Sequence, residues 1–203
     1  MPRAVIGLTG NIATGKSTVA ELLRARGAFV INADQLARAA VAPGTPALAQ
    51  IVAQFGSGVL LPDGALDRRA LGQLVFSDPA KLRQLEAIVH PVVRASIAQH
   101  MAEAPPDGIV VLEVIRLFEG GLDELCDEVW VTHCPPEIQL QRLTQLRGLT
   151  EQEAAQRIAA QTPQADKLAR ANVVIDTSGS LTETERQVQA AWQRLTCRLQ
   201  SKL

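Results

Sequence analysis

The sequence contains no tyrosine, only two tryptophans and four phenylalanines among its 203 residues. Surfaces that bind single-stranded nucleic acid stack bases on aromatic side chains, so this composition offers little for such a surface. Twenty basic and 21 acidic residues give a formal net charge of −1, which provides no bulk attraction for polyanions or for membranes. We therefore expect neither nucleic acid nor a membrane as partner, and any phosphate ligand must be held by local charges.

Cysteines and long apolar runs are also scarce. Cys126, Cys134 and Cys197 are widely separated and lack metal-ligand spacing, so we expect reduced thiols instead of a disulfide framework. The N-terminus lacks the features of a signal peptide, and no segment has the length of a membrane span, which predicts a cytoplasmic protein. With 47% hydrophobic residues, the chain can form one substantial domain, as a monomer or a small homo-oligomer.

The most informative part of the sequence is the segment GLTGNIATGKST, which follows an apolar strand predicted at residues 4–9. Gly10, Gly15, Lys16 and Ser17 fit the pattern G-x-x-x-x-G-K-[ST], and apolar residues at helical spacing follow. Glycines permit backbone angles that turn several N–H groups toward one anion, and the helix N-terminus adds partial positive charge. The full spacing in a strand, loop and helix context favours a phosphate-binding loop over a glycine-rich turn with a solvated lysine.

This loop predicts binding of ATP together with Mg²⁺. Lys16 would reach the β- and γ-phosphates, and the hydroxyl of Ser17 would bind the metal ion. The residues expected to contact the nucleotide are Gly10, Asn11, Ala13, Thr14, Gly15, Lys16, Ser17, Thr18 and, from a later segment, Arg142.

Short apolar runs alternate with helical patterns, which predicts an α/β fold with a P-loop NTPase-like, five-stranded parallel sheet flanked by helices. The predicted strands span residues 4–9, 28–32, 108–113, 128–132 and 172–176. The clearest helical patterns cover residues 17–26, 35–41, 67–76, 79–101 and 181–199, with another helix opened by the prolines at 135 and 136.

We expect a single α/β domain. Its core comprises about residues 1–42, 105–137 and 170–203, and a helical insertion spans about 43–104. A break at 43–48 and a loop or short hairpin at 56–67 interrupt the helices of the insertion. Asp67, and then Ser77 or Asp78, are predicted to cap helices there.

Asp34 follows the second predicted strand, at the sheet edge where open parallel sheets bind ligands. A carboxylate there can accept the proton of an attacking hydroxyl, as the base of a kinase does. The alternative is that Asp34 only caps a helix starting at Gln35. The spacing leaves both readings open.

Three arginines, Arg142, Arg147 and Arg157, flank the turn RGLTEQEA, where Thr150 and Glu153 form a capping box. Two helices joined by a short loop and carrying arginines are typical of a hinged lid, which we place at about residues 138–169. Such a lid could close over ATP and offset charge on the transferred group. A solvated pair of charged helices is the alternative.

Taken together, these segments resemble the dephospho-coenzyme A kinase family. Beyond the phosphate loop, the resemblance rests on VINADQLAR, on the stretch from Leu66 to Val93, on RLFEGGLDE, and on the segment from Arg142 to Gln161. It covers nearly the whole chain, and the stretch from 66 to 93 is its most specific part. The resemblance implies ATP-dependent phosphorylation of the ribose 3′-hydroxyl of dephospho-coenzyme A, giving coenzyme A and ADP.

The resemblance also implies a single kinase domain with three parts, in which the helical insertion at about residues 43–104 binds the substrate. It implies roles for individual residues as well. Asp34 would be the base, Lys16 and Ser17 the phosphate and magnesium contacts, and Arg147 a catalytic lid arginine. Residues of the substrate side would be Asp34, Arg68, Arg69, His90 and Arg116. Arginines suit a pyrophosphate, whereas His90 before a proline could equally be a packed, hydrogen-bonded histidine.

Some positions depart from the usual family pattern. Asn32 stands where relatives usually carry Asp, and Ile115-Arg116-Leu117 replaces a common Pro-Leu-Leu. Asn172 and Thr177 replace an Asp and an Asn in a segment expected to border the adenine pocket. None of these changes removes a group that the mechanism requires.

Two rival functions share the phosphate loop. One is a kinase for another small molecule, such as a nucleoside or a sugar-like alcohol. The other is a nucleotide switch that hydrolyses slowly. The switch is disfavoured because no Asn-Lys-x-Asp type segment for reading guanine follows the later strands.

Overall fold

The computed structural model describes residues 4–201, except for the side chain of Phe76. The chain divides into two compact units, one formed by residues up to 32 together with those from 103 onward, the other by residues 33–102. All three cysteines carry free thiols, as predicted. Within residues 4–201, no helix combines the length and the apolar character needed to cross a membrane.

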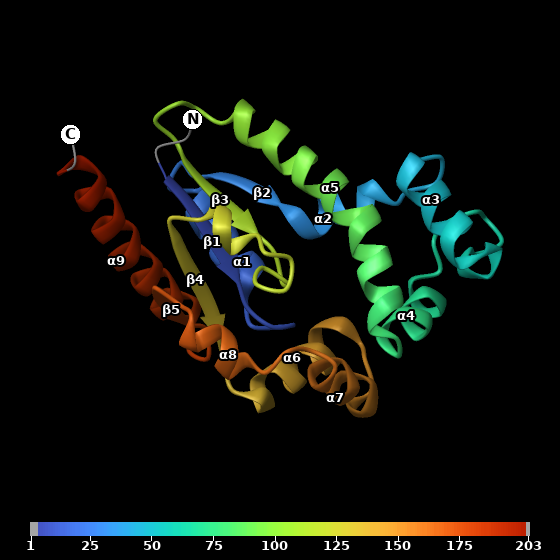
Figure 1. Ribbon diagram of the computed structural model, residues 1–203. Helices are drawn as coiled ribbons and strands as arrows, with labels where there is room; N and C mark the ends of the chain where they lie inside the picture. The colour runs from blue at the N-terminus through green and yellow to red at the C-terminus, as the bar shows by residue number, and fades with distance from the viewer. Residues whose placement is uncertain (1–3, 202–203) are drawn as a thin grey trace. The chain divides into compact units, whose positions relative to one another are not determined.

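The first unit contains a five-stranded parallel sheet with the order β2–β3–β1–β4–β5 (Figure 1). Its strands are β1 (Ala4–Thr9), β2 (Phe29–Asn32), β3 (Ile109–Glu113), β4 (Glu128–His133) and β5 (Val173–Asp176). The central strands β1 and β3 are buried along their whole length, as continuous apolar runs in parallel sheets are. The predicted fold class is confirmed, and each predicted strand agrees with the structure to within one residue.

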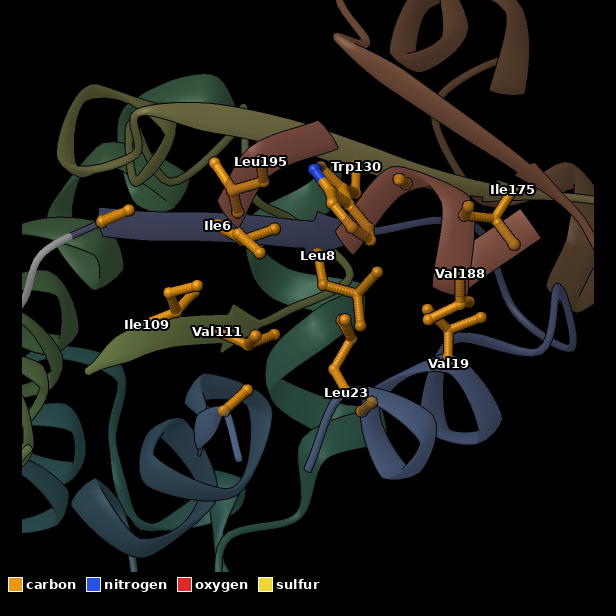
Figure 2. Close-up of a cluster of buried hydrophobic side chains, with 14 residues drawn as sticks. Ile6, Leu8, Val19, Leu23, Ile109, Val111, Trp130, Ile175, Val188 and Leu195 are labelled. Carbon is orange, nitrogen blue, oxygen red and sulfur yellow. The ribbon is translucent and has the colours of Figure 1, made fainter. Parts of the chain in front are cut away.

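Helices α1 (Lys16–Arg24) and α9 (Leu181–Gln200) cover one face of this sheet. Because side chains alternate along a strand, every second residue of β1 points to these helices. Figure 2 shows Ile6 and Leu8 packed with Trp130 of β4 against Leu23 of α1 and Leu195 of α9. This cluster fixes α1, and with it the loop that precedes α1, on the sheet.

The remaining helices of the first unit follow β3 and β4. They are the 3-10 turn η2 (Asp123–Leu125), α6 (Pro136–Arg147), α7 (Glu151–Ala159) and the short α8 (Gln164–Ala169). Thr150 and Glu153 form the predicted capping box at the start of α7. Gly148 ends α6 in a left-handed conformation, with φ +65°, so α6 and α7 form a helical hairpin within this unit.

The second unit contains α2 (Ala33–Ala40), α3 (Pro46–Phe55), the turn η1 (Ser57–Val59), α4 (Arg68–Phe76) and nearly all of α5 (Pro79–Glu103). The carboxylate of Asp67 accepts hydrogen bonds from the first N–H groups of α4, and Asp78 does the same for α5. An antiparallel bridge between Leu60 and Leu66 decides between the loop and the short hairpin expected at 56–67 in favour of the hairpin. Apolar side chains of α3, α4 and α5 form this unit's own core around Ile51 and Val75.

Candidate active site

The loop between β1 and α1 has the backbone that its glycines predict. Gly15 caps α1 with φ +79°, in the left-handed region that favours glycine. A Cβ atom on Gly10 would lie 2.7 Å from the carbonyl oxygen of Thr132, so a side chain cannot be accommodated there. Ala13, with φ +61°, adopts the left-handed conformation without being a glycine. These angles produce the sharp turns that bring successive N–H groups to one side.

Buried threonines hold this loop from within the protein. The hydroxyl of Thr14 donates to the carbonyl of Asn11 at 2.7 Å and shares a 2.8 Å hydrogen bond with the hydroxyl of Thr132. The hydroxyl of Thr177, just after β5, donates to the carbonyl of Thr14 at 2.9 Å. The side chains of Asn11 and Thr14 are buried, and their backbone N–H groups donate to Gln164 and to the carbonyl of Asn11, so both residues are bonded within the protein.

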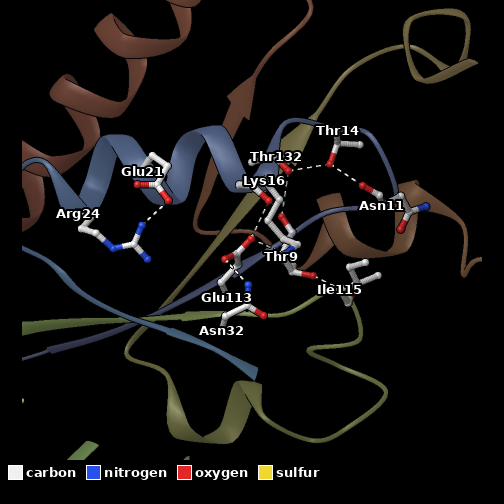
Figure 3. A network of polar contacts seen from close by, with 11 residues as sticks. Thr9, Asn11, Thr14, Lys16, Glu21, Arg24, Asn32, Glu113, Ile115 and Thr132 are labelled. Carbon is white, nitrogen blue, oxygen red and sulfur yellow. Dashed lines mark hydrogen bonds and ion pairs between the residues drawn. The ribbon is translucent and has the colours of Figure 1, made fainter. Parts of the chain in front are cut away.

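Glu113 joins the residues at the end of the loop (Figure 3). Its Oε1 atom lies 2.7 Å from the ammonium of Lys16 and 3.2 Å from the hydroxyl of Ser17. Its Oε2 atom accepts a 2.9 Å hydrogen bond from the amide of Asn32. A buried carboxylate is stable only when it is paired and hydrogen bonded, and here one cation and two neutral donors satisfy it.

The register of the sheet explains why these residues meet. Glu113, the last residue of β3, is paired with Asn32 on one side and with Leu8 on the other. Parallel strands end at the same edge, so the chain leaving β1 reaches Lys16 beside Glu113. Glu113 is not among the site residues predicted from the sequence. The available signal was an acidic residue at the last position of the otherwise apolar strand IVVLE.

Arg142 on α6 contacts the same loop. Its Nη1 atom donates to the carbonyl of Ala13 at 3.0 Å and to the hydroxyl of Thr177 at 3.1 Å. Arg147 is the last residue of α6 and is exposed, as is Arg157 on α7. Of the three arginines expected in the lid, Arg142 therefore contacts the phosphate loop in this structure.

Three glutamines that were not predicted from the sequence also bind the loop backbone. Gln139 lies on α6, whereas Gln161 and Gln164 lie between α7 and the start of α8. Their side chains reach the backbone groups of Asn11 and Ile12. No motif marks these positions, because contacts between distant segments depend on the fold.

Asn172 and Thr177, which depart from the usual family pattern, lie at opposite ends of β5. The Oδ1 atom of Asn172 accepts a 2.7 Å hydrogen bond from the backbone N–H of Val129, at the amino end of β4. Thr177 lies at the carboxyl end, against the phosphate loop. Asn172 thus extends the pairing of β5 with β4, whereas the expectation that this segment borders an adenine pocket stays a prediction.

The segment after β3 carries Arg116, which is exposed, and a buried lysine. Lys167 of α8 donates to the carbonyl of Ile115 at 2.5 Å and lies 3.8 Å from the carboxylate of Glu119. Burial alone would raise the pKa of Glu119. The hydrogen bond from Thr162 and the charges of Lys167 and Arg116 outweigh it, so the pKa of Glu119 is lowered.

The other predicted residues belong to the second unit. Asp34 is the second residue of α2, which begins at Ala33, so it does not precede a helix starting at Gln35. Partial burial lowers the pKa of Arg68, and the neighbouring positive charge of Arg38 lowers it further. Arg69 is exposed on α4, and His90 is half-buried on α5.

Comparisons with known proteins agree on one family. Residues 4–183 match the family model described as dephospho-CoA kinase. The dephospho-CoA kinase of Geobacter sulfurreducens is 48% identical over 190 residues, which cover 93% of this chain and 96% of that protein. The crystal structure of a Thermus thermophilus protein aligns with a TM-score of 0.81 and 38% identity, covering 95% of this chain and 97% of that one. Dephospho-CoA kinase from Campylobacter jejuni aligns with a TM-score of 0.64 and 28% identity, covering 96% and 98%.

Proposed function

Because the chain belongs to the dephospho-CoA kinase family, we propose that it transfers the γ-phosphoryl group of ATP to the ribose 3′-hydroxyl of dephospho-coenzyme A. The products are coenzyme A and ADP, and the reaction takes place in the cytoplasm. The observation that carries the proposal is the phosphate loop, with its glycine-dependent backbone and with Lys16 and Ser17 beside Glu113.

Different groups of the protein have different roles in phosphoryl transfer. Backbone N–H groups of the loop and the N-terminus of α1 bind the phosphates, and Lys16 offsets their negative charge. The substrate's 3′-oxygen forms a bond to the γ-phosphorus while the bond to the bridging oxygen of ADP breaks. Asp34 takes the proton released by the hydroxyl. Arg147 of the lid offsets charge on the group in transit, and closure keeps water from accepting it.

The residues present also fit a magnesium ion. Mg²⁺ prefers oxygen ligands, and the hydroxyl of Ser17 and the carboxylate of Glu113 lie 3.2 Å apart at the end of the phosphate loop. These two groups would hold the ion, directly or through water. When bound, the ion neutralises charge on the β- and γ-phosphates.

For dephospho-coenzyme A we propose a binding role of Arg68, Arg69, His90 and Arg116. The effect of the charge of Arg38 on the pKa of Arg68 supports this binding role. An anion such as the substrate's pyrophosphate would relieve the repulsion between the two guanidinium groups. Arg116 lies just past β3 and is exposed, so its guanidinium is available to a phosphate.

A panel of acceptors tests the proposal. The protein is incubated with ATP and Mg²⁺ and with dephospho-coenzyme A, a nucleoside or a sugar-like alcohol, and ADP is measured. We expect ADP release that depends on dephospho-coenzyme A. Release with another acceptor only would indicate a different small-molecule kinase, and release that needs no acceptor would indicate a slow nucleotide switch.

A further inference from the structure

The backbone of Ile12 is bound on both sides by glutamines of the α6–α7 hairpin region. Its N–H donates to Oε1 of Gln161 at 2.6 Å, and its carbonyl accepts from Nε2 of Gln139 at 2.8 Å. Gln139 is the fourth residue of α6 and is buried, and Gln161 lies two residues beyond the end of α7. The two ends of the hairpin thus bind one residue of the phosphate loop.

Neighbouring backbone groups of the loop are bound in the same way. The N–H of Asn11 donates to Gln164 at 3.1 Å, and the carbonyl of Ala13 accepts from Arg142 at 3.0 Å. The carbonyl of Thr14 accepts from Thr177 at 2.9 Å. Three consecutive carbonyls, those of residues 12, 13 and 14, are therefore each tied to a side chain of another segment.

These hydrogen bonds determine where the N–H group that follows each carbonyl points. A peptide unit is planar and trans, so the N–H of one residue points away from the carbonyl of the residue before it. With the carbonyls of Ile12 and Thr14 held by the protein, the N–H groups of Ala13 and Gly15 point to the opposite side. That is the orientation in which successive N–H groups bind an anion.

The loop needs such external support. Ala13 has φ +61°, a conformation that is unfavourable for residues with a Cβ atom and that persists only where surrounding contacts impose it. The bonds to the carbonyls of Ile12 and Ala13 flank this residue and fix the peptide units on both of its sides.

We propose that Gln139 and Gln161 are positioning residues, which hold the phosphate loop ready for nucleotide phosphates before the nucleotide binds. They act through Ile12 and touch no reacting atom. The inference rests on the proposed function only in taking a nucleotide phosphate as the ligand. A preformed loop avoids the entropic cost of ordering on binding, so the glutamines act on nucleotide affinity and not on the transfer step.

The test compares Gln139→Met and Gln161→Met, which keep the side-chain length but lose the polar atoms, with Gln141→Met at an exposed position of α6. Calorimetry measures the Kd for MgATP, steady-state kinetics measure KM and kcat, and hydrogen exchange measures residues 11–15 without nucleotide. Loss of one such hydrogen bond should weaken MgATP binding by about 5- to 10-fold. We expect kcat at saturating ATP to stay within about twofold, faster exchange at Ile12, whose N–H loses its acceptor in Gln161→Met, and no change in Gln141→Met.

Variants with wild-type MgATP affinity and wild-type exchange would overturn the inference and leave the glutamines as anchors of the hairpin alone. A loss confined to kcat would overturn it too. If Gln139→Met does not fold, Gln161→Met, at a half-buried position, decides alone. If the wild-type protein does not bind MgATP, the proposed function fails, while the exchange of Ile12 still shows whether Gln161 holds the loop.

Discussion

At the scale of single residues, one carboxylate organises the charges of the site. Glu113 is bonded to Lys16, Ser17 and Asn32. This accounts for the neutral residue at position 32, because an amide donates a hydrogen bond to Glu113 where a second carboxylate would repel it. The departure from the family pattern at Asn32 therefore fits the acid at the end of β3.

Lys16→Ala removes the cation at the end of the phosphate loop. We expect turnover to fall by at least about 10²–10³-fold, because no other group would take over its contact with the β- and γ-phosphates. The fold should persist, since the apolar sheet core does not include this side chain, but the unfolding midpoint should fall because buried Glu113 loses its paired cation. ADP release with dephospho-coenzyme A and the thermal unfolding midpoint measure the two effects. Lys81→Ala, at an exposed lysine on α5, is the control and should keep full activity.

Asp34→Asn removes the proposed base and keeps the size of the side chain. ATP binding should stay largely intact, whereas the transfer rate should fall by about 10²–10⁴-fold, the usual contribution of general base catalysis. Calorimetry with ATP and single-turnover kinetics separate the two quantities, and Asp107→Asn at an exposed position is the control. Near-normal turnover in Asp34→Asn would remove this residue from the role of base.

From the lowered pKa of Glu119 we predict a pH dependence of the free energy of unfolding. Its lowered pKa in the folded state means that its ionised form stabilises the fold at pH values above the unfolded pKa of about 4.3. This contribution is lost as the pH falls through the lowered pKa. We expect Glu119→Gln to reduce the free energy of unfolding at pH 7, and the difference from wild type to shrink toward pH 3. Urea unfolding at both pH values measures it, and a difference that is equal or larger at pH 3 would contradict the assignment.

Among the single residues of the site, those in a local motif could be predicted from the sequence, and those held by long-range contacts could not. Gly10, Gly15 and Lys16 could be predicted, because their spacing is a local pattern with a known geometry. The contacts of Glu113 and Gln161 with the loop could not, because these residues reach it from about 100 and 150 residues away in the chain. Their roles depend on the strand order and on the path of the hairpin.

At the scale of elements, helix starts were predictable where a capping side chain stands before an apolar pattern. Asp67, Asp78 and Thr150 all accept hydrogen bonds from the N–H groups that follow them. The start of α3 is of the same kind, with Thr45 as cap and Pro46 in the first turn, but the prolines and glycine around it indicated only a break. Helix α8 has six residues, too few for a helical period to be recognised.

The capping box of α7 gives a prediction at this scale. Thr150→Ala loses the hydroxyl that accepts from the N–H of Glu153, and it should lower the free energy of unfolding by about 1 kcal/mol. Thr150→Ser keeps the hydroxyl and should stay close to wild type. Urea unfolding followed by circular dichroism measures both variants. Equal stabilities of Thr150→Ala and Thr150→Ser would show that the cap contributes nothing.

At the scale of the whole molecule, the sheet order explains where the site is. β2 and β3 lie on one side of β1, and β4 and β5 lie on the other. The carboxyl end of β1 is therefore the point where the strand order reverses, and open parallel sheets bind ligands at such points. The phosphate loop begins there. Five parallel strands were predictable from the alternating pattern, but their order was not, because it is set by long-range packing.

For the complete reaction we propose that the core, the 33–102 unit and the α6–α7 hairpin have separate roles. The most direct test of this proposal is phosphorus NMR of the product formed from ATP, Mg²⁺ and dephospho-coenzyme A, with ADP measured in parallel. The account predicts one ADP for each acceptor consumed, a new phosphate on the ribose 3′-oxygen, and no product with Lys16→Ala. ADP formed at the same rate without dephospho-coenzyme A, or an acceptor that gains no 3′-phosphate, would contradict it.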